Sequence, residues 1–148
     1  MTYKIRTTSL EQTQDIAYKI GKWVSNGMIL TLEGDLGAGK TTFTKGLAKG
    51  LGINRNVNSP TFNIIKSYQG TDLKLHHMDC YRLEDSEEDL GFNEYFEDEA
   101  VILIEWSQFI AEFLPEHYLS VNIQTENDAE RTITINAQGE HYLRIKED

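Results

Sequence analysis

The N-terminal third of the chain alternates between strand-like and helix-like patterns of apolar positions. Ser9 followed by Gln12 predicts a capping box that opens a helix, and Asn26 with Gly27 predicts the end of that helix. A continuous apolar run then predicts a buried strand, which leads through a glycine turn into a second helix. The expected elements are a strand over residues 3–7, a helix over residues 10–24, a strand over residues 28–32, a turn over residues 34–39 and a helix over residues 40–51.

The remainder of the chain is dominated by strand-like segments. Residues 101–104 form a continuous apolar run rich in β-branched side chains, which is typical of a strand covered on both faces of a parallel sheet. The acidic segment over residues 84–99 predicts a short helix plus a loop. Further strands are expected over residues 62–68 and 73–79, joined by a turn that contains Gly70, and over residues 119–124, 131–136 and 142–145.

Composition and charge narrow the class of protein. A chain of 148 residues is expected to form a single domain with a sizeable core. Its single cysteine, Cys80, cannot form an internal disulfide, and we find neither a leader nor an apolar run of membrane-spanning length. We therefore expect a cytoplasmic protein that does not enter a membrane. The net charge of −10 argues against autonomous binding of RNA or DNA.

The segment from Leu32 to Gly46 reads LEGDLGAGKTTFTKG and contains the pattern G-x-x-x-x-G-K-[ST]. In a P-loop of this pattern, backbone N–H groups donate to phosphate oxygens, the lysine reaches the β- and γ-phosphates, and the hydroxyl contacts Mg²⁺. Because the pattern lies between a predicted strand and a predicted helix, we interpret it as a nucleotide-binding loop; the alternative is a glycine-rich turn without a ligand. The predicted phosphate-binding residues are Asp35, Leu36, Gly37, Ala38, Gly39, Lys40, Thr41 and Thr42.

Two carboxylates compete for the role of magnesium ligand. Glu105 directly follows the apolar run over residues 101–104, and Asp79 ends the strand-like segment over residues 73–78. Both are expected at the carboxyl ends of strands, where open α/β sheets gather their ligands. The apolar run favours Glu105 as the Walker B residue, although a glutamate departs there from the commoner aspartate. For each residue the alternative is a solvated carboxylate at a strand end.

His76 and His77 precede Asp79 and raise the question of a metal site. A strand places adjacent side chains on opposite faces, so only His77 is expected to share a face with Asp79. The chain has no cysteine pair and no His-x-x-x-His spacing, which disfavours zinc. Neither histidine is therefore among the predicted site residues.

Four short motifs stand out by their order and spacing: GDLGAGKTT in the P-loop, SPTF at residues 59–62, HMDCYRL at residues 77–83 and LIEW at residues 103–106. Together they resemble the TsaE (YjeE) family, the bacterial ATPase component of tRNA threonylcarbamoyladenosine synthesis. The resemblance implies an α/β fold in which a P-loop NTPase-type sheet is flanked by helices and extended by antiparallel strands. Residues 1–148 would then form a single P-loop ATPase domain.

The resemblance also implies a catalytic and magnesium-binding set. Lys40 and Thr41 would hold ATP and Mg²⁺, and Glu105 would complete the magnesium site. Asp79 would be a further residue needed for turnover. Thr61 lies in a segment similar to a switch I loop, where its hydroxyl would sense the γ-phosphate and Mg²⁺; a plain loop is the alternative.

Several residues at the margin of this set receive weaker assignments from the resemblance. Ser9 or Glu11, at the start of the first helix, is expected near the adenine. Trp106 would lie next to the site, with a core aromatic as the alternative. Gln108 occupies a position that is often acidic in the family, and we assign it no role.

The resemblance finally implies the partners TsaB and TsaD, which together transfer threonylcarbamoyl to adenosine 37 of tRNA. The chain would contact tRNA only indirectly, through that complex. Arg82 is the sole candidate we find for an arginine finger, so the chain is expected to be a slow ATPase until partners complete the site. The alternatives are a small-molecule kinase and a nucleotide-gated interaction module.

Overall fold

The computed structural model describes residues 2–24, 27–34, 39–54, 57, 65–80, 94–95, 98, 100–108, 110, 114, 118–127 and 130–137. Strands and helices alternate in the first part of the chain, and the elements described after them are strands. No helix among these residues is long and apolar enough to cross a membrane. The elements are β1 (Thr2–Thr7), α1 (Leu10–Trp23), β2 (Ile29–Gly34), α2 (Lys40–Gly50), β3 (Ile65–Gln69), β4 (Lys74–Asp79), β5 (Ala100–Glu105), β6 (Leu119–Thr125) and β7 (Arg131–Ala137).

All of these strands belong to one sheet with the order β1-β7-β6-β2-β5-β4-β3. The central strands β6, β2, β5 and β4 run parallel, so their carboxyl ends meet at one edge of the sheet. β3 and β7 run antiparallel to their neighbours. The fold class predicted from the sequence, a P-loop-type sheet with added antiparallel strands, is thereby confirmed. The strand expected over residues 142–145 and most of the acidic segment over residues 84–99 lie outside the described residues.

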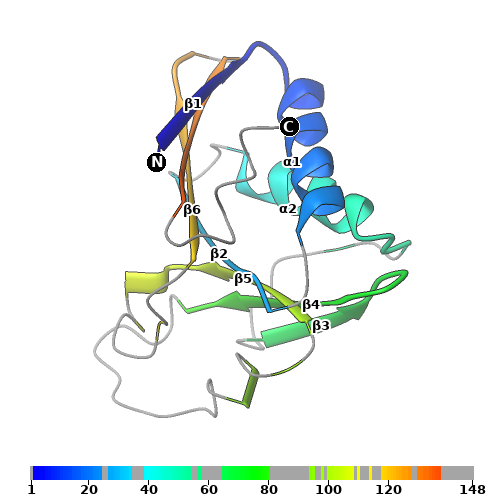
Figure 1. Cartoon of the computed structure of the whole chain (residues 1–148). Coiled ribbons are helices and arrows are strands. Elements are labelled where there is room, and N and C mark those ends of the chain that lie inside the picture. The colour runs from blue at the N-terminus through cyan, green and yellow to red at the C-terminus, as the bar shows by residue number, and fades with distance from the viewer. Residues whose placement is uncertain are drawn as a thin grey trace.

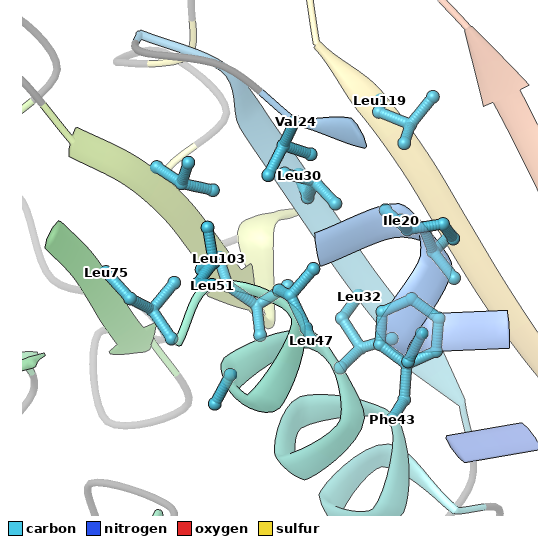
Figure 2. Packing of buried hydrophobic residues seen from close by; sticks show 14 of the residues in the cluster. Ile20, Val24, Leu30, Leu32, Phe43, Leu47, Leu51, Leu75, Leu103 and Leu119 are labelled. Atoms are coloured by element: carbon cyan, nitrogen blue, oxygen red, sulfur yellow. The ribbon is translucent and has the colours of Figure 1, made fainter. Parts of the chain in front are cut away.

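Both helices lie against the same face of the sheet (Figure 1). Alternation along β2 turns Leu30 and Leu32 toward the helices, while Ile29 packs on the opposite face. Phe43 and Leu47 of α2 are fully buried against this leucine-rich face (Figure 2). Burial of side chains of this size stabilises the fold by about 1.5–3 kcal/mol each. The helix that follows the predicted phosphate loop is therefore anchored directly on the strand that precedes it.

The two helices approach each other closely at three glycines. A Cβ atom added at Gly46 of α2 would lie 2.4 Å from the backbone oxygen of Gln14 in α1. At Gly50 it would lie 2.3 Å from the backbone oxygen of Tyr18, and at Gly21 of α1 it would lie 2.4 Å from that of Leu47. Because any larger residue would push the helices apart, this crossing fixes α2, and with it the position of Lys40.

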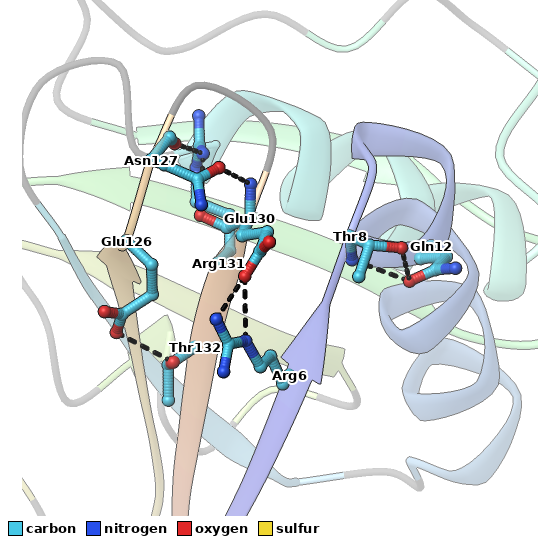
Figure 3. Close-up of polar contacts among 8 residues, drawn as sticks. All are labelled: Arg6, Thr8, Gln12, Glu126, Asn127, Glu130, Arg131 and Thr132. Atoms are coloured by element: carbon cyan, nitrogen blue, oxygen red, sulfur yellow. Dashed lines mark hydrogen bonds and ion pairs between the residues drawn. The ribbon is translucent and has the colours of Figure 1, made fainter.

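The N-terminus of α1 is closed by its own side chains. The hydroxyl of Ser9 accepts a hydrogen bond from the backbone N–H of Gln12 at 3.1 Å, which confirms the predicted cap. The second half of the predicted capping box is different: Oε1 of Gln12 accepts from the backbone N–H of Thr8 at 2.7 Å and not from that of Ser9 (Figure 3). The glutamine thus ties the helix to the residue that follows β1.

Polar contacts join β1 to the β6–β7 hairpin at the same edge of the sheet (Figure 3). Nε of Arg6 donates to Oε2 of Glu130 at 2.9 Å, and the two side chains form an ion pair. Arg131, which is buried, donates from Nη1 to the backbone oxygens of Asn127 and Glu130 at 2.8 and 2.9 Å. Both arginine side chains therefore bind within the hairpin region.

Candidate nucleotide site

The predicted phosphate loop joins β2 to α2 at the carboxyl edge of the sheet. Gly39 precedes the first helical residue with φ of 104°, a left-handed conformation that L side chains rarely adopt. Lys40 then begins α2, as the pattern G-K-T predicted. The predicted residues Asp35, Leu36, Gly37 and Ala38 lie outside the described residues. The strand expected before the motif and the helix expected after it are nevertheless in place.

The N-terminus of α2 is open where that of α1 is closed. Gly39 at the N-cap of α2 has no side chain, no side-chain cap is found among the described residues, and the first turn carries no acidic residue. The first turn of α1, in contrast, has the Ser9 cap and contains Glu11. Unsatisfied N–H groups and the positive end of the helix dipole make an open N-terminus of this kind favourable for an anion. Thr41 lies exposed in this first turn and Thr42 is half-buried.

Lys40 and Glu105 face each other across this edge. Nζ of Lys40 lies 3.8 Å from Oε1 of Glu105, and the side chains are 16% and 6% exposed. The same Nζ lies 5.1 Å from the centre of the Trp106 ring. Two predicted site residues that are far apart in the sequence are thus brought together, and the lysine is held between a carboxylate and an aromatic face.

Glu105 and Asp79 occupy equivalent positions at the ends of neighbouring strands. Glu105 is the last residue of β5 and pairs in register with Asp79 of β4 and with Leu32 of β2. Neighbouring strands lie about 4.8 Å apart, so the two carboxylates are adjacent on the face that α2 covers. The prediction that both residues end strands is confirmed. Which of them contacts Mg²⁺ stays a prediction.

His77 is a buried partner of Glu105 that the sequence interpretation did not identify. Its Nε2 lies 2.8 Å from Oε2 of Glu105, and the side chains are 1% and 6% exposed. Nδ1 of the same ring is buried and has no hydrogen-bond partner among the described residues. The alternation along β4 correctly placed His77 on the face of Asp79. The contact itself depends on the pairing of β4 with β5. The pattern of residues within one strand does not predict which strand will lie beside it.

The side chain of His76 lies on the opposite face of the sheet. Its Nδ1 lies 2.7 Å from Oγ of Ser67 on β3, and its Nε2 lies 2.8 Å from Oδ2 of Asp98. The ring also packs edge-on against Tyr95. Both ring nitrogens are therefore bonded to side chains away from Lys40 and Glu105.

Cys80 follows Asp79 in the chain and is buried in the apolar cluster on the face of the sheet opposite the helices. Its backbone N–H donates to the backbone oxygen of Glu105 at 3.0 Å, which extends the pairing of the two strands past Asp79. Burial, together with the negative charge of Asp79, raises the pKa of the thiol from 9.0 to about 12. The thiol is therefore neutral at physiological pH, and it is not a reactive nucleophile.

A polar cavity of about 290 Å³ opens beside Lys40 at the carboxyl edge of the sheet. Trp106 contributes to it with φ of 59°, a strained conformation for an aromatic residue. Gln108, to which the sequence interpretation gave no role, also lines it. The alternation along β6 turns Asn122 and Gln124 to the face opposite the helices, but polar residues at strand positions gave no signal of a site. The lining includes Glu33, Lys40, Trp106, Gln108, Asn122 and Gln124.

The structure shows no contact among its described residues that joins Ser9 to this arrangement. The hydroxyl of Ser9 caps α1 by accepting a hydrogen bond from Gln12, and Ser9 is not among the described residues that line the cavity. Its predicted contact with adenine stays a prediction. Thr61, predicted to sense the γ-phosphate, lies outside the described residues.

Comparison with known proteins gives consistent matches over nearly the whole chain. The family model described as "Threonylcarbamoyl adenosine biosynthesis protein TsaE" matches residues 7–133. The tRNA threonylcarbamoyladenosine biosynthesis protein TsaE of Bacillus subtilis is 52% identical over 145 residues, which cover 98% of this chain and 92% of that protein. The protein of the same name from Treponema pallidum is 41% identical over 118 residues, covering 78% of this chain and 87% of that one.

A solved structure shows the same fold. The crystal structure of YdiB from Bacillus subtilis superposes with a TM-score of 0.87 at 46% sequence identity. The match covers 99% of this chain and 93% of that chain. At this TM-score, identity and coverage, this chain and the solved protein share one fold.

Proposed function

This chain belongs to the TsaE family of threonylcarbamoyl adenosine biosynthesis proteins, and we propose that it binds and hydrolyses ATP with Mg²⁺ in support of that tRNA modification. The observation that carries the proposal is the pairing of Lys40 with Glu105 beside the open N-terminus of α2. An anion site and a carboxylate at adjacent points of one sheet edge are what binding of a magnesium triphosphate requires.

The residues at this edge have distinct roles in the proposal. The N–H groups at the start of α2 and the ammonium of Lys40 bind the β- and γ-phosphates. The backbone of residues 35–38 completes the phosphate loop. Thr61, in the segment similar to a switch I loop, reports whether the γ-phosphate is present. Binding of the triphosphate would draw Lys40 from Glu105 toward the phosphate oxygens, because the more highly charged group competes for the same ammonium.

The available donors fit Mg²⁺ better than a soft metal. Glu105 and Asp79 provide carboxylate oxygens, and the exposed Thr41 provides a hydroxyl at the start of α2. The described residues contain no cluster of three or more His, Cys, Asp or Glu side chains that would form a closed metal cage. Mg²⁺ commonly uses one or two carboxylates together with substrate phosphates, where it neutralises charge on the phosphate oxygens.

We infer that turnover is slow in the isolated chain and rises when partners bind. The described arginines, Arg6 and Arg131, both bind within the β1 and β6–β7 region, so neither supports a cationic clamp on the γ-phosphate. The predicted candidate Arg82 lies outside the described residues. Homologues of TsaB and TsaD are the proposed partners, and tRNA would be reached only through them, because the net charge of −10 disfavours direct contact.

The decisive experiment measures ATP hydrolysis by the purified chain with Mg²⁺, alone and with TsaB and TsaD, followed by an assay of modified tRNA. The proposal predicts slow turnover alone, faster turnover with both partners and loss of modified tRNA without the chain. Unchanged turnover at saturating partners, together with normal tRNA in cells that lack the chain, would refute it.

The cavity beside Lys40 is the specific observation that keeps a small-molecule kinase as the second candidate, because an acceptor could lie there. Following the γ-phosphate of labelled ATP separates the two: release into water supports the ATPase, and transfer to a metabolite supports the kinase. A nucleotide-gated interaction module would instead retain docking and biological rescue after Asp79→Ala or Glu105→Ala had abolished turnover.

A further inference from the structure

His77 fixes one of the two oxygens of the Glu105 carboxylate. A carboxylate only accepts hydrogen bonds, so the contact of 2.8 Å is donated by the Nε2–H of His77 to Oε2 of Glu105. The other oxygen, Oε1, is directed toward Lys40. The two oxygens of one carboxylate are thus divided between a buried strand residue and the phosphate side of the site.

We propose that His77 is a positioning residue that orients Glu105 toward the magnesium side of the nucleotide site. The proposal rests on the proposed function and deepens it, because it assigns a role to a residue outside the predicted set. His77 acts through Glu105 and touches neither the nucleotide nor the metal. What it supplies is a carboxylate whose Oε1 is already aimed when the phosphates arrive.

Strand geometry explains how the ring reaches its partner. His77 pairs in register with Leu103, and Asp79 pairs with Glu105, so His77 and Glu105 are diagonal neighbours on one face of the sheet. Side chains at diagonal positions are within reach when they are long or aromatic. The imidazole and the glutamate meet this condition. A shorter aspartate at position 105 would hold the carboxylate nearer to its own backbone and farther from the imidazole.

A long carboxylate needs such an anchor more than a short one does. Glutamate has more rotatable bonds than aspartate, so more conformational freedom must be removed to hold its oxygens in one geometry. Hydrogen bonds from outside the ligand set supply this orientation at metal sites, and removing one typically costs about 10- to 100-fold in metal affinity or activity. The unusual glutamate at position 105 and the buried histidine beside it therefore belong together.

The hydrogen-bond partners of the two adjacent histidines distinguish a positioning role for His77 from a purely structural one. Both nitrogens of His76 bind side chains, and these link β3 to the segment that contains Asp98. His77 bonds through Nε2 to Glu105, while its Nδ1 has no partner within the described part of the chain. Among the described residues, the one side-chain hydrogen bond of His77 therefore leads into the site and not across the fold.

The test compares His77→Leu with His77→Gln, which restores an N–H donor near the position of Nε2. His76→Leu is the matched control, since it removes another buried imidazole that also binds a carboxylate at 2.8 Å. Calorimetry measures the Mg²⁺ dependence of ATP-analogue binding to each variant, and thermal unfolding reports on the fold. We expect His77→Leu to raise the Mg²⁺ concentration for half-maximal binding by about 10- to 100-fold, His77→Gln to recover most of this loss, and His76→Leu to change only thermal unfolding.

A double-mutant cycle with Glu105→Ala shows whether the effect passes through Glu105. Once Glu105 is removed, His77→Leu should cause no further change in the Mg²⁺ requirement. An equal further loss in that background, or an unchanged Mg²⁺ requirement in His77→Leu alone, would overturn the inference while leaving the proposed function intact. Failure of the unaltered chain to bind the magnesium nucleotide would overturn both.

Discussion

Nζ of Lys40 lies 3.8 Å from Oε1 of Glu105, although the two residues come from the start of α2 and the end of β5. The pair exists because α2 packs on the face of the sheet toward which Glu105 points, and because the helix begins where the neighbouring strand β2 has just ended. The charge proposed to bind phosphate and the charge proposed to bind metal are thus positioned by the same packing.

Replacing the lysine tests its role in phosphate binding. Lys40→Ala removes the ammonium without removing the open helix N-terminus, so we expect affinity for ATP to fall by about 10- to 100-fold, the range for loss of a charged hydrogen bond. Calorimetric titration with an ATP analogue provides the measurement. Lys45→Ala, at an exposed position of the same helix, is the control and should bind as the unaltered chain does. Equal affinity in the two variants would contradict the assignment.

The two adjacent carboxylates are distinguished by neutral replacements of the same shape. Glu105→Gln keeps an oxygen that can accept from His77 but loses the charge that faces Lys40. We expect it to raise the Mg²⁺ concentration for half-maximal ATP turnover by about tenfold or more, and more than Asp79→Asn does. A full Mg²⁺ titration of each variant measures this, with exposed Glu126→Gln as the control. The reverse ranking would transfer the magnesium role to Asp79.

The close helix crossing predicts a stability effect away from the site. In Gly46→Ala the new methyl group would lie 2.4 Å from a backbone oxygen of α1 and 2.9 Å from the Cβ of Ala17. Relief requires the helices to separate, so the free energy of unfolding should fall by about 1–3 kcal/mol. Urea unfolding measures the change, with Lys45→Ala expected to stay within about 0.5 kcal/mol of the unaltered chain. A stable Gly46→Ala variant would mean that the helices can move apart freely.

The raised pKa of Cys80 predicts a dependence on alkaline pH. In the folded chain the thiol stays protonated up to about pH 12, whereas the unfolded thiol ionises near its ordinary pKa of 9.0. The folded state therefore binds more protons between these values, and the stabilising contribution, complete below pH 9.0, is lost as pH rises toward 12.

Urea unfolding of the unaltered chain and of Cys80→Ala at a series of pH values isolates this contribution. The stability difference between the two proteins should shift against the unaltered chain as pH rises above 9.0. A difference that does not vary with pH would contradict the assignment. Effects of pH on the rest of the chain are common to both proteins and cancel.

Local patterns predicted the elements of this fold but not their lateral neighbours. The apolar run that ends at Glu105 was sufficient to place a buried parallel strand, because burial on both faces leaves a continuous apolar segment. The insertion of β7 between β1 and β6 brings together segments from opposite ends of the chain. Hydrophobic periodicity within each segment contains no information about that pairing.

The candidate site likewise contains some residues that local sequence predicts and others that only the fold brings together. Lys40, Glu105 and Asp79 follow from a local motif and from the rule that ligands gather at the carboxyl ends of parallel strands. The bond from His77 to Glu105 depends on strand register, and the lining of the cavity by Gln108 and Asn122 depends on which strand ends lie side by side. Polar residues of ordinary type carry no signal of such a role until the fold places them.

The account depends most directly on where a triphosphate lies. A crystal structure of the chain with Mg²⁺ and a non-hydrolysable ATP analogue would show this. We expect the triphosphate at the N-terminus of α2, with Nζ of Lys40 on the β- and γ-phosphate oxygens and the metal on the side of Thr41 and Glu105. A triphosphate bound elsewhere, or a metal remote from both Glu105 and Asp79, would contradict the account.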